Sequence, residues 1–248
     1  MAMDVTSTRY VLLTGAAGGM GRAFARALVA SGRRILLVDR DAVRLEALRA
    51  ELGNEAVAIV LDVADSAGVA ALPGRIPAAF QPVDVLINNA GHDIGGRTRF
   101  DEGAADDWAA IVETNLIGTM RVTRAILPEM VARNRGHVVN MSSINAVRIV
   151  PDMAAYSASK AGMHMFTETI RGELAETAIR ITELQPGLTR TGIIRTRYRG
   201  DAAKEQAYFD QFKMAMEPED IARCILFALD QPPHVQIAEI MVLPVNRY

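Results

Sequence analysis

Short apolar runs alternate with helix-like repeats along almost the whole chain. The expected strands cover residues 10–13, 34–38, 56–61, 83–87, 136–141, 179–184 and 235–243. Between these runs, apolar residues recur every three to four positions, which is the spacing of one helix face. Strands that alternate with helices are typical of a parallel sheet covered by helices on both faces. We therefore expect a three-layer, doubly wound α/β fold with seven strands.

Three stretches between the strands are less regular. Residues 65–81 contain two glycines and two prolines, which predict a broken helix. Residues 106–133 form one long helix pattern with Asn115 in the middle, and Pro128 should kink it. Residues 188–216 are polar and rich in arginine, and we expect them to form a substrate lid. The chain has no repeat or linker, so residues 1–248 should form a single domain.

The first expected strand leads into a glycine-rich loop and then a helix. The loop reads Thr14-Gly15-Ala16-Ala17-Gly18-Gly19-Met20-Gly21, and the next strand ends at Asp39, 18 residues past Gly21. Glycines let the backbone approach a pyrophosphate, and the free N–H groups at a helix N-terminus bind anions. An acid at this distance is typical of ribose binding. The unit predicts a dinucleotide site, although its glycine spacing differs from the common G-x-G-x-x-G.

Charge and composition narrow the possible partners. The chain has 27 basic and 29 acidic residues, which gives no sign of a nucleic-acid or membrane-surface partner. Cys224 is the only cysteine, so neither an internal disulfide nor a thiolate metal cluster is possible. His164 and Glu168 share a helix face, and we interpret them as a surface pair without a metal. Residues 1–9 lack the apolar core of a signal peptide, and no run is long enough to span a membrane, so we expect a cytoplasmic protein.

Tyr156 and Lys160 are four positions apart on an expected helix, so both side chains should lie on one face. A cation beside a phenol favours the phenolate, and we expect the pKa of Tyr156 to fall below its usual value of about 10. A tyrosine that exchanges a proton near neutral pH can act as a general acid or base. The alternative is an ordinary pair on a solvated helix face.

Polar or small residues follow most of the expected strands. They are the loop from Gly15 to Gly21, Asp39, Asp62, Asn88-Asn89-Ala90-Gly91, Ser143 and Pro186-Gly187. In a parallel α/β sheet, ligands bind beyond the carboxyl ends of the strands. We therefore expect these residues to form one site.

With these motifs in this order, the chain resembles the short-chain dehydrogenase/reductase family. The resemblance is carried by Thr14-Gly15-x-x-x-Gly19-x-Gly21, Asn88-Asn89-Ala90-Gly91, Asn115, Ser143, Tyr156-x-x-x-Lys160 and Pro186-Gly187. It implies a Rossmann-type sheet of order 3-2-1-4-5-6-7 and a homodimer or homotetramer. It also implies hydride transfer between a nicotinamide cofactor and a secondary alcohol or ketone, or a related alcohol or aldehyde. A non-catalytic NAD(P)-binding protein on the same fold is the alternative.

The resemblance assigns roles to individual residues. Tyr156 would donate or accept the proton, Lys160 would lower its pKa and bind the nicotinamide ribose, and Ser143 would bind the substrate oxygen. Asn115 would hold a water that links Lys160 to solvent. The expected cofactor-binding residues are Gly15, Gly19, Met20, Gly21, Asp39, Arg40, Asp62, Val63, Asn89, Ala90, Gly91, Tyr156, Lys160, Pro186, Gly187 and Thr189. The expected substrate-binding residues are Ser143, Asn145, Tyr156, Ile149, Met153 and His92, with Asp93, Val147, Leu188 and Tyr198 as further neighbours.

The sequence leaves alternatives for the cofactor and for the arginines of residues 188–216. Asp39 would bond both ribose hydroxyls of NAD and repel a 2′-phosphate, and Gly18 stands where NADP-preferring relatives often carry a basic residue. Arg40 argues the other way, since it could pair with a phosphate. We expect NAD rather than NADP. The arginines of residues 188–216 could bind an anionic substrate or simply be solvated; they are Arg190, Arg195, Arg197 and Arg199.

Overall fold

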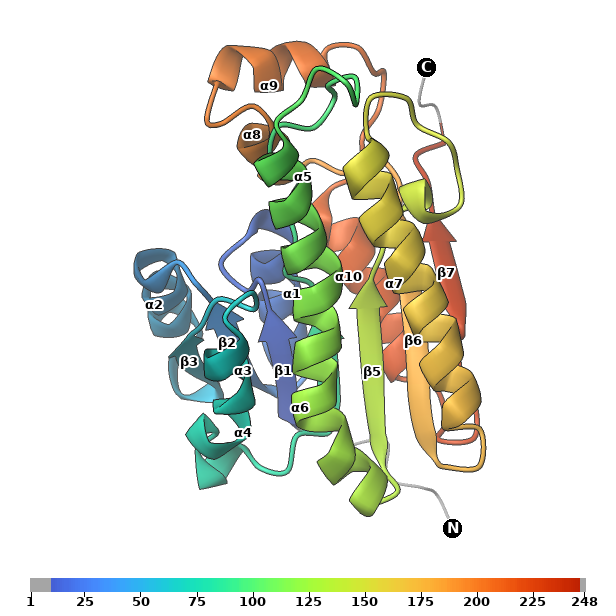
Figure 1. Ribbon diagram of the computed structural model, residues 1–248. Coiled ribbons are helices and arrows are strands. Elements are labelled where there is room, and N and C mark those ends of the chain that lie inside the picture. The colour runs from blue at the N-terminus through green and yellow to red at the C-terminus, as the bar shows by residue number, and fades with distance from the viewer. Residues whose placement is uncertain (1–9, 246–248) are drawn as a thin grey trace.

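The computed structural model describes residues 10–245, and the expectation for residues 1–9 lies outside them. Seven parallel strands form one sheet of order β3-β2-β1-β4-β5-β6-β7, which confirms the predicted single-domain fold and strand order (Figure 1). The strands are β1 (Tyr10–Thr14), β2 (Arg34–Asp39), β3 (Ala56–Val60), β4 (Val85–Asn88), β5 (Gly136–Met141), β6 (Ile179–Pro186) and β7 (Glu239–Val242).

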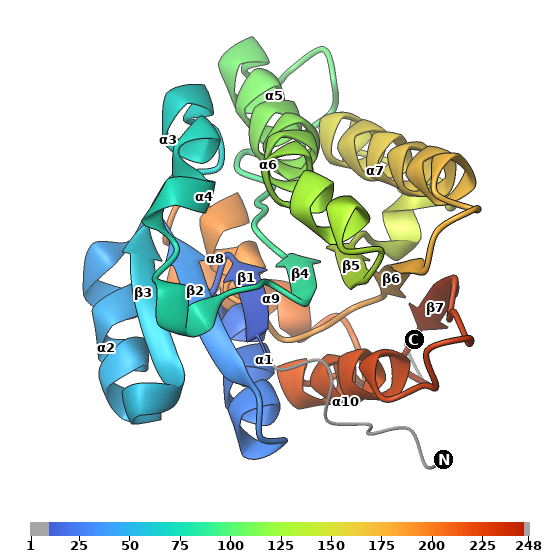
Figure 2. The same cartoon turned by 90° about the horizontal axis from the view of Figure 1, so that it is seen from below.

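Helices cover both faces of the sheet (Figure 2). One layer contains α1 (Gly19–Ala30), α2 (Ala42–Leu52) and α10 (Pro218–Leu229). The other contains α3 (Ser66–Ala70), α4 (Leu72–Arg75), α5 (Ala105–Val112), α6 (Thr119–Ala132) and α7 (Ala154–Glu173). Side chains alternate along β1, so Val11 and Leu13 pack in one core and Leu12 in the other. Burial on both faces explains why the strands are continuous apolar runs.

Of the two irregular helix patterns, the first is as predicted and the second is divided at a place that was not predicted. Residues 65–81 form the short helices α3 and α4 and a 3₁₀ turn, Ala78–Phe80, which confirms the broken helix. The long pattern of residues 106–133 is interrupted by a π-helical turn, Glu113–Gly118, which contains Asn115. Pro128 lies inside α6, and the helix continues past it to Ala132. Among the described residues, no helix has the length and apolarity to cross a bilayer.

Residues 188–216, which we call the lid segment, lie beyond the carboxyl ends of the strands, at the top of Figure 1. They contain α8 (Ile193–Arg197) and α9 (Ala202–Phe209). Asp201 caps α9 by accepting hydrogen bonds from two backbone N–H groups. The segment has a small apolar core of its own, made by Leu188, Ile194, Tyr208 and Phe209. These side chains pack the two short helices of the segment against each other.

Candidate active site

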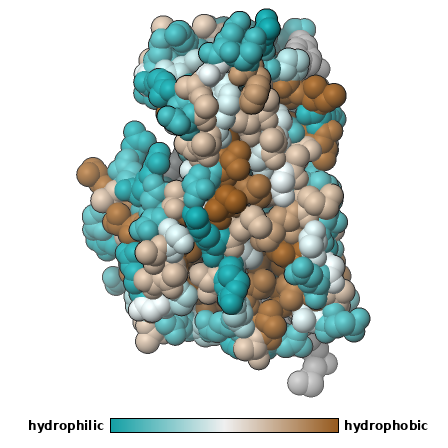
Figure 3. Space-filling model, in the orientation of Figure 1, coloured by the Kyte–Doolittle hydropathy of each residue, from teal (hydrophilic) through white to brown (hydrophobic). Residues whose placement is uncertain are grey.

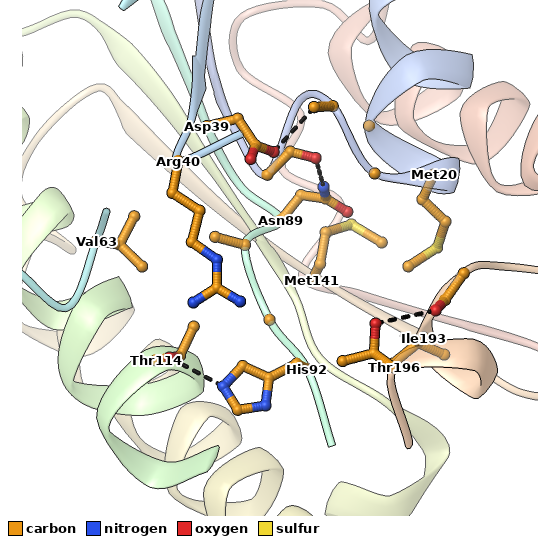
Figure 4. A pocket seen from close by; sticks show the side chains of 18 of the residues that line it. Met20, Asp39, Arg40, Val63, Asn89, His92, Thr114, Met141, Ile193 and Thr196 are labelled. Carbon is orange, nitrogen blue, oxygen red and sulfur yellow. Dashed lines mark hydrogen bonds between the residues drawn. The ribbon is translucent and has the colours of Figure 1, made fainter. Parts of the chain in front are cut away.

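A cavity of about 310 Å³ opens at the carboxyl edge of the sheet, where the sequence predicts a site (Figure 4). Most of the predicted cofactor-binding residues line it, together with His92. Those residues are Gly15, Gly19, Met20, Gly21, Asp39, Arg40, Asp62, Val63, Asn89, Ala90, Gly91, Tyr156 and Lys160. Residues from β1, β2, β4, α7 and the loops between them therefore meet as expected.

Three predicted cofactor residues do not line this cavity: Pro186, Gly187 and Thr189. Thr189 instead forms a β-bridge with Met216 at the base of the lid segment. The lid contributes residues slightly later in the chain, namely Thr191, Gly192, Ile193 and Thr196. Ala17 and Gly18 also line the cavity, as part of the predicted glycine loop, and the lining residues that were not predicted are Val38, Asp41, Arg44, Leu61, Thr114, Met141 and Ser142. Arg44 could have been found, because it lies in the first turn of the helix that Asp41 caps.

The glycine loop is joined directly to the end of β4. Thr14 Oγ1 accepts hydrogen bonds from the backbone N–H groups of Asn89 and Ala90, at 3.0 and 3.1 Å. The Asn89 amide donates in return to the carbonyl oxygens of Thr14 and Gly15. Gly15 has a φ of +64°, and a Cβ there would lie 2.8 Å from the Ala90 Cα. Only glycine fits this close approach, which brings two of the predicted motifs together.

The acid at the end of β2 is engaged by the protein's own backbone. Asp39 accepts hydrogen bonds from the N–H groups of Ala17 and Asp41, at 2.9 and 3.0 Å, one on each carboxylate oxygen. Arg40 is largely exposed, lies 3.5 Å from Asp62, and reaches into the cavity in Figure 4. Arg44 also lines the cavity, so this end of the site offers two guanidinium groups.

Tyr156 and Lys160 line the other end of the cavity, and Ser143 does not line it but lies near Tyr156. The Lys160 Nζ lies 5.7 Å from the centre of the Tyr156 ring, which confirms that the two share a helix face. Ser143 is close enough for its hydroxyl to lower the pKa of Tyr156 by hydrogen bonding. The buried Lys160 ammonium donates to the Met141 carbonyl oxygen at 2.7 Å. The three polar groups needed to bind and protonate a carbonyl oxygen are therefore in one place.

The predicted fall in the pKa of Tyr156 is wrong for this structure. Burial raises the pKa of Tyr156, and the nearby Asp93 charge raises it further, whereas Ser143 and Arg197 act in the opposite direction. Burial also lowers the pKa of Lys160 to about 8. In a solvated pair the cation would favour the phenolate, but removal from water disfavours the charged form of both groups. The resting phenol is therefore neutral.

Asn115 is fully buried in the π-helical turn and makes three side-chain hydrogen bonds. Its amide oxygen accepts from the His92 N–H at 2.9 Å, and its amide nitrogen donates to the His92 carbonyl oxygen at 2.9 Å. The nitrogen also donates to Ser159 Oγ at 3.1 Å. Asn115 thus holds the strand-end loop and α7, so it is a positioning residue in this structure.

The predicted substrate residues divide into two groups. His92 lines the main cavity, and Met153 and Tyr156 line a small adjoining hollow of about 10 Å³. Asn145 is close to Ser143, because its N–H donates to the serine Oγ at 3.2 Å. Ile149 is 97% exposed and lines neither space, so the structure does not support its assignment.

His164 does not pair with Glu168 as the sequence suggested. Its Nδ1 lies 2.6 Å from the buried carboxylate of Glu183, and Glu168 pairs with Arg171 instead. Four residues place possible metal-ligating atoms within 4.8 Å of one another, namely His164, Glu168, Glu183 and Glu239. Glu183 is paired with His164 and Glu168 with Arg171. The expected absence of a metal stays a prediction.

Comparisons with known proteins identify the family. The family model described as short chain dehydrogenase matches residues 9–202. The chain belongs to the short-chain dehydrogenase family. A chain of the closed form of serine dehydrogenase complexed with NADP⁺ superposes with a TM-score of 0.92 and 32% identity over 95% of both chains.

Curated short-chain dehydrogenases of similar length correct the cofactor. The NADP-dependent 3-hydroxy acid dehydrogenase YdfG of Salmonella typhi is 34% identical over 96% of this chain and 95% of its own. A probable NADP-dependent dehydrogenase of Haemophilus influenzae is 33% identical over 96% and 94%. The expectation of NAD is therefore wrong, because these relatives are named NADP-dependent and the similar serine dehydrogenase structure contains NADP⁺. Hydride transfer between an NAD(P) cofactor and an alcohol or ketone is the activity of this dehydrogenase.

The depressed pKa of Lys160 predicts a pH dependence of stability. Its pKa is about 8 in the folded protein, against about 10.4 in the unfolded chain. Between these values the unfolded chain binds more protons, so the Lys160 contribution to stability should rise with pH. Urea unfolding of the wild type and of Lys160→Met, from about pH 7 to 10.5, measures it. The free energy of unfolding of the wild type should increase relative to the variant across this window. A difference that stays constant or falls would contradict the burial of a charged lysine.

Proposed function

We propose that this dehydrogenase uses NADP to interconvert a secondary alcohol and a ketone, with Tyr156 as the proton donor and acceptor. One observation supports this most: Tyr156 and Lys160 line one end of a cavity whose other end presents Arg40 and Arg44, and Ser143 lies near Tyr156. A nicotinamide dinucleotide has its reactive ring and its adenosine phosphate at opposite ends. The two ends of the cavity suit these two ends of the cofactor.

The cofactor supplies or accepts the hydride, and the residues of the chain handle the oxygen and its proton. The hydroxyls of Ser143 and Tyr156 lie near each other, so both can point at one carbonyl oxygen. Donors that are in place before negative charge develops on that oxygen stabilise the transition state without reorganisation. In reduction, Tyr156 Oη then gives its proton to the new alkoxide.

The raised pKa of Tyr156 fits the reductive direction. A buried phenol stays protonated at neutral pH and is ready to donate. After donation, the phenolate lies beside the buried Lys160 ammonium, which is 5.7 Å from the ring centre in the resting structure. A neighbouring cation in a buried site stabilises such an anion more than it would in water. Lys160 therefore stabilises the phenolate form of Tyr156, although burial keeps the phenol protonated at rest.

Arg40 and Arg44 support the assignment of NADP. Both line the cavity at the carboxyl end of β2, where the adenosine ribose of a dinucleotide binds in this fold. Asp39 already accepts two backbone hydrogen bonds, so its carboxylate is partly compensated. Arg40 can move from Asp62 to a phosphate, since a 3.5 Å ion pair at an exposed position is weak.

We also propose that the lid segment closes over the substrate and that the protein forms a homodimer or homotetramer. Lid residues Thr191, Gly192, Ile193 and Thr196 line the cavity, which supports the first idea. Apolar atoms gather on the face formed by α5, α6 and α7 in Figure 3, and Met120 and Met165 are 40% and 62% exposed. Exposed apolar patches of this kind often mark contacts between subunits.

Replacing Tyr156 with phenylalanine should abolish most turnover without loss of nucleotide binding. Removal of the phenol that gives its proton to the alkoxide should lower kcat by about 10² to 10⁴. Ketone reduction is followed at the absorbance of NADPH, and the dissociation constant of NADPH is measured by fluorescence. A Phe variant that keeps near-wild-type kcat would exclude Tyr156 as the proton donor. A wild type that binds NADPH but reduces no ketone would favour a non-catalytic nucleotide-binding protein.

Replacing Arg40 with serine should lower the preference for NADPH. Loss of a charged partner for the 2′-phosphate should reduce the ratio of kcat/KM with NADPH to that with NADH by about tenfold or more. Arg49→Ala is a matched control, because Arg49 lies on α2 outside the cavity and pairs with Glu46. An unchanged ratio in Arg40→Ser, or a wild type that prefers NADH, would contradict the assignment.

A further inference from the structure

All four arginines of the lid segment that could bind an anionic substrate are paired with carboxylates of the protein. The sequence left two possibilities for them, an anionic substrate or plain solvation. The pairs are Arg190 with Glu217 at 3.4 Å, Arg195 with Glu205 at 2.7 Å, Arg197 with Asp93 at 2.6 Å and Arg199 with Asp107 at 2.6 Å. None of these four guanidinium groups is an uncompensated positive charge.

The pair between Arg197 and Asp93 differs from the other three because it is buried. Arg197 is 6% exposed and Asp93 is fully buried. The Arg197 Nε and Nη2 both approach the same carboxylate oxygen, Asp93 Oδ2, at 2.7 and 2.6 Å. The guanidinium also lies over the Tyr208 ring, 4.9 Å from its centre. Because the charges of Arg197 and Asp93 lie this close together, they largely cancel each other at a more distant group.

Both residues of this pair directly follow residues that line the cavity, since Asp93 comes after His92 and Arg197 comes after Thr196. The charge of Asp93 raises the pKa of Tyr156 and the charge of Arg197 lowers it, so both are close enough to act on the phenol. Asp93 follows His92, whose backbone N–H and carbonyl are both held by Asn115. The Gly95 N–H donates to the Arg197 carbonyl oxygen at 3.2 Å, which fixes α8 against the same loop. Asp93 is therefore a fixed negative charge, and Arg197 docks onto it.

The second carboxylate oxygen of Asp93 also disfavours the binding of a substrate acid here. Oδ1 is buried and has no hydrogen-bond partner in the described part of the chain. An unpaired carboxylate oxygen repels another carboxylate and attracts a hydrogen-bond donor. The Arg197 Nη1 is likewise buried and without a hydrogen-bond partner among the described residues, so a substrate acid could bind it only by sharing the guanidinium with Asp93, or else by displacing Asp93. Either arrangement would leave a buried negative charge without compensation.

We propose that Asp93 determines substrate specificity by neutralising Arg197, so that this dehydrogenase acts on neutral ketones and secondary alcohols rather than hydroxy acids. The proposal rests on the proposed function and adds the charge of the substrate to it. It sets this chain apart from the relatives that are named 3-hydroxy acid dehydrogenases. Arg197 serves in this chain to hold the lid segment, and Asp93 is the carboxylate to which its guanidinium is already bound.

Matched pairs of ketones that differ only in charge test this directly. Ethyl acetoacetate and acetoacetate share one carbonyl, and homologous keto esters and keto acids extend the series. With NADPH, the wild type should reduce the esters with a kcat/KM about tenfold or more above that for the acids. Asp93→Asn should shift this ratio toward the acids by about tenfold or more, because it frees the Arg197 charge. Asp107→Asn, which removes the partner of the exposed Arg199, should leave the ratio unchanged.

A double variant separates charge from folding. Asp93→Leu with Arg197→Met removes both charges and keeps apolar volume, and it should retain the preference for esters. Circular dichroism and thermal unfolding verify that each variant is folded. A wild type that prefers the acids would overturn the proposal, as would a folded Asp93→Asn with an unchanged ratio. If the wild type reduces no member of the series with NADPH, the proposed function itself fails.

Discussion

The hydrogen bonds of one buried amide hold the site together. Asn115 binds both backbone polar groups of His92 and the hydroxyl of Ser159, and the Ser159 hydroxyl donates to the Tyr156 carbonyl oxygen at 2.7 Å. A single side chain therefore connects the end of β4 to the helix that bears the proton donor. Since a buried polar group left without a partner costs about 1–3 kcal/mol, these bonds define one arrangement. The π-helical turn makes them possible, because the added residue in that turn re-aims a side chain that a regular helix would present differently.

Burial then sets the charges of the groups that this framework positions. The pKa of Tyr156 is raised, that of Lys160 is lowered to about 8, and that of Asp93 is raised to about 6 despite its ion pair. In each case removal from water is the largest cause, and neighbouring charges adjust the result. A site built this way keeps its proton on the phenol at rest. A ligand that carries a charge must also find an opposite charge in the site, because a buried charge without a partner is energetically unfavourable.

The sequence predicted those features that depend on local pattern. Strands buried on both faces are visible as apolar runs, and the glycine loop and the spacing of Tyr156 and Lys160 are fixed by chain geometry. The resemblance added the strand order. Features that depend on contacts between residues far apart in the chain could not be predicted from local pattern. Asp93 and Arg197 are 104 residues apart. The pKa of Tyr156 depends on burial that no helix pattern shows, and the cofactor preference turned on the competing influence of Asp39 and Arg40.

Amide hydrogen exchange in an Asn115→Ala variant tests most directly whether this one side chain organises the site. If it does, peptides that cover residues 89–95 and residues 154–160 should both exchange faster than in the wild type, by about tenfold, because both lose the partner that holds them closed. Peptides from β6 should not change. Faster exchange confined to residues 113–119, with both distant segments unaffected, would contradict the account.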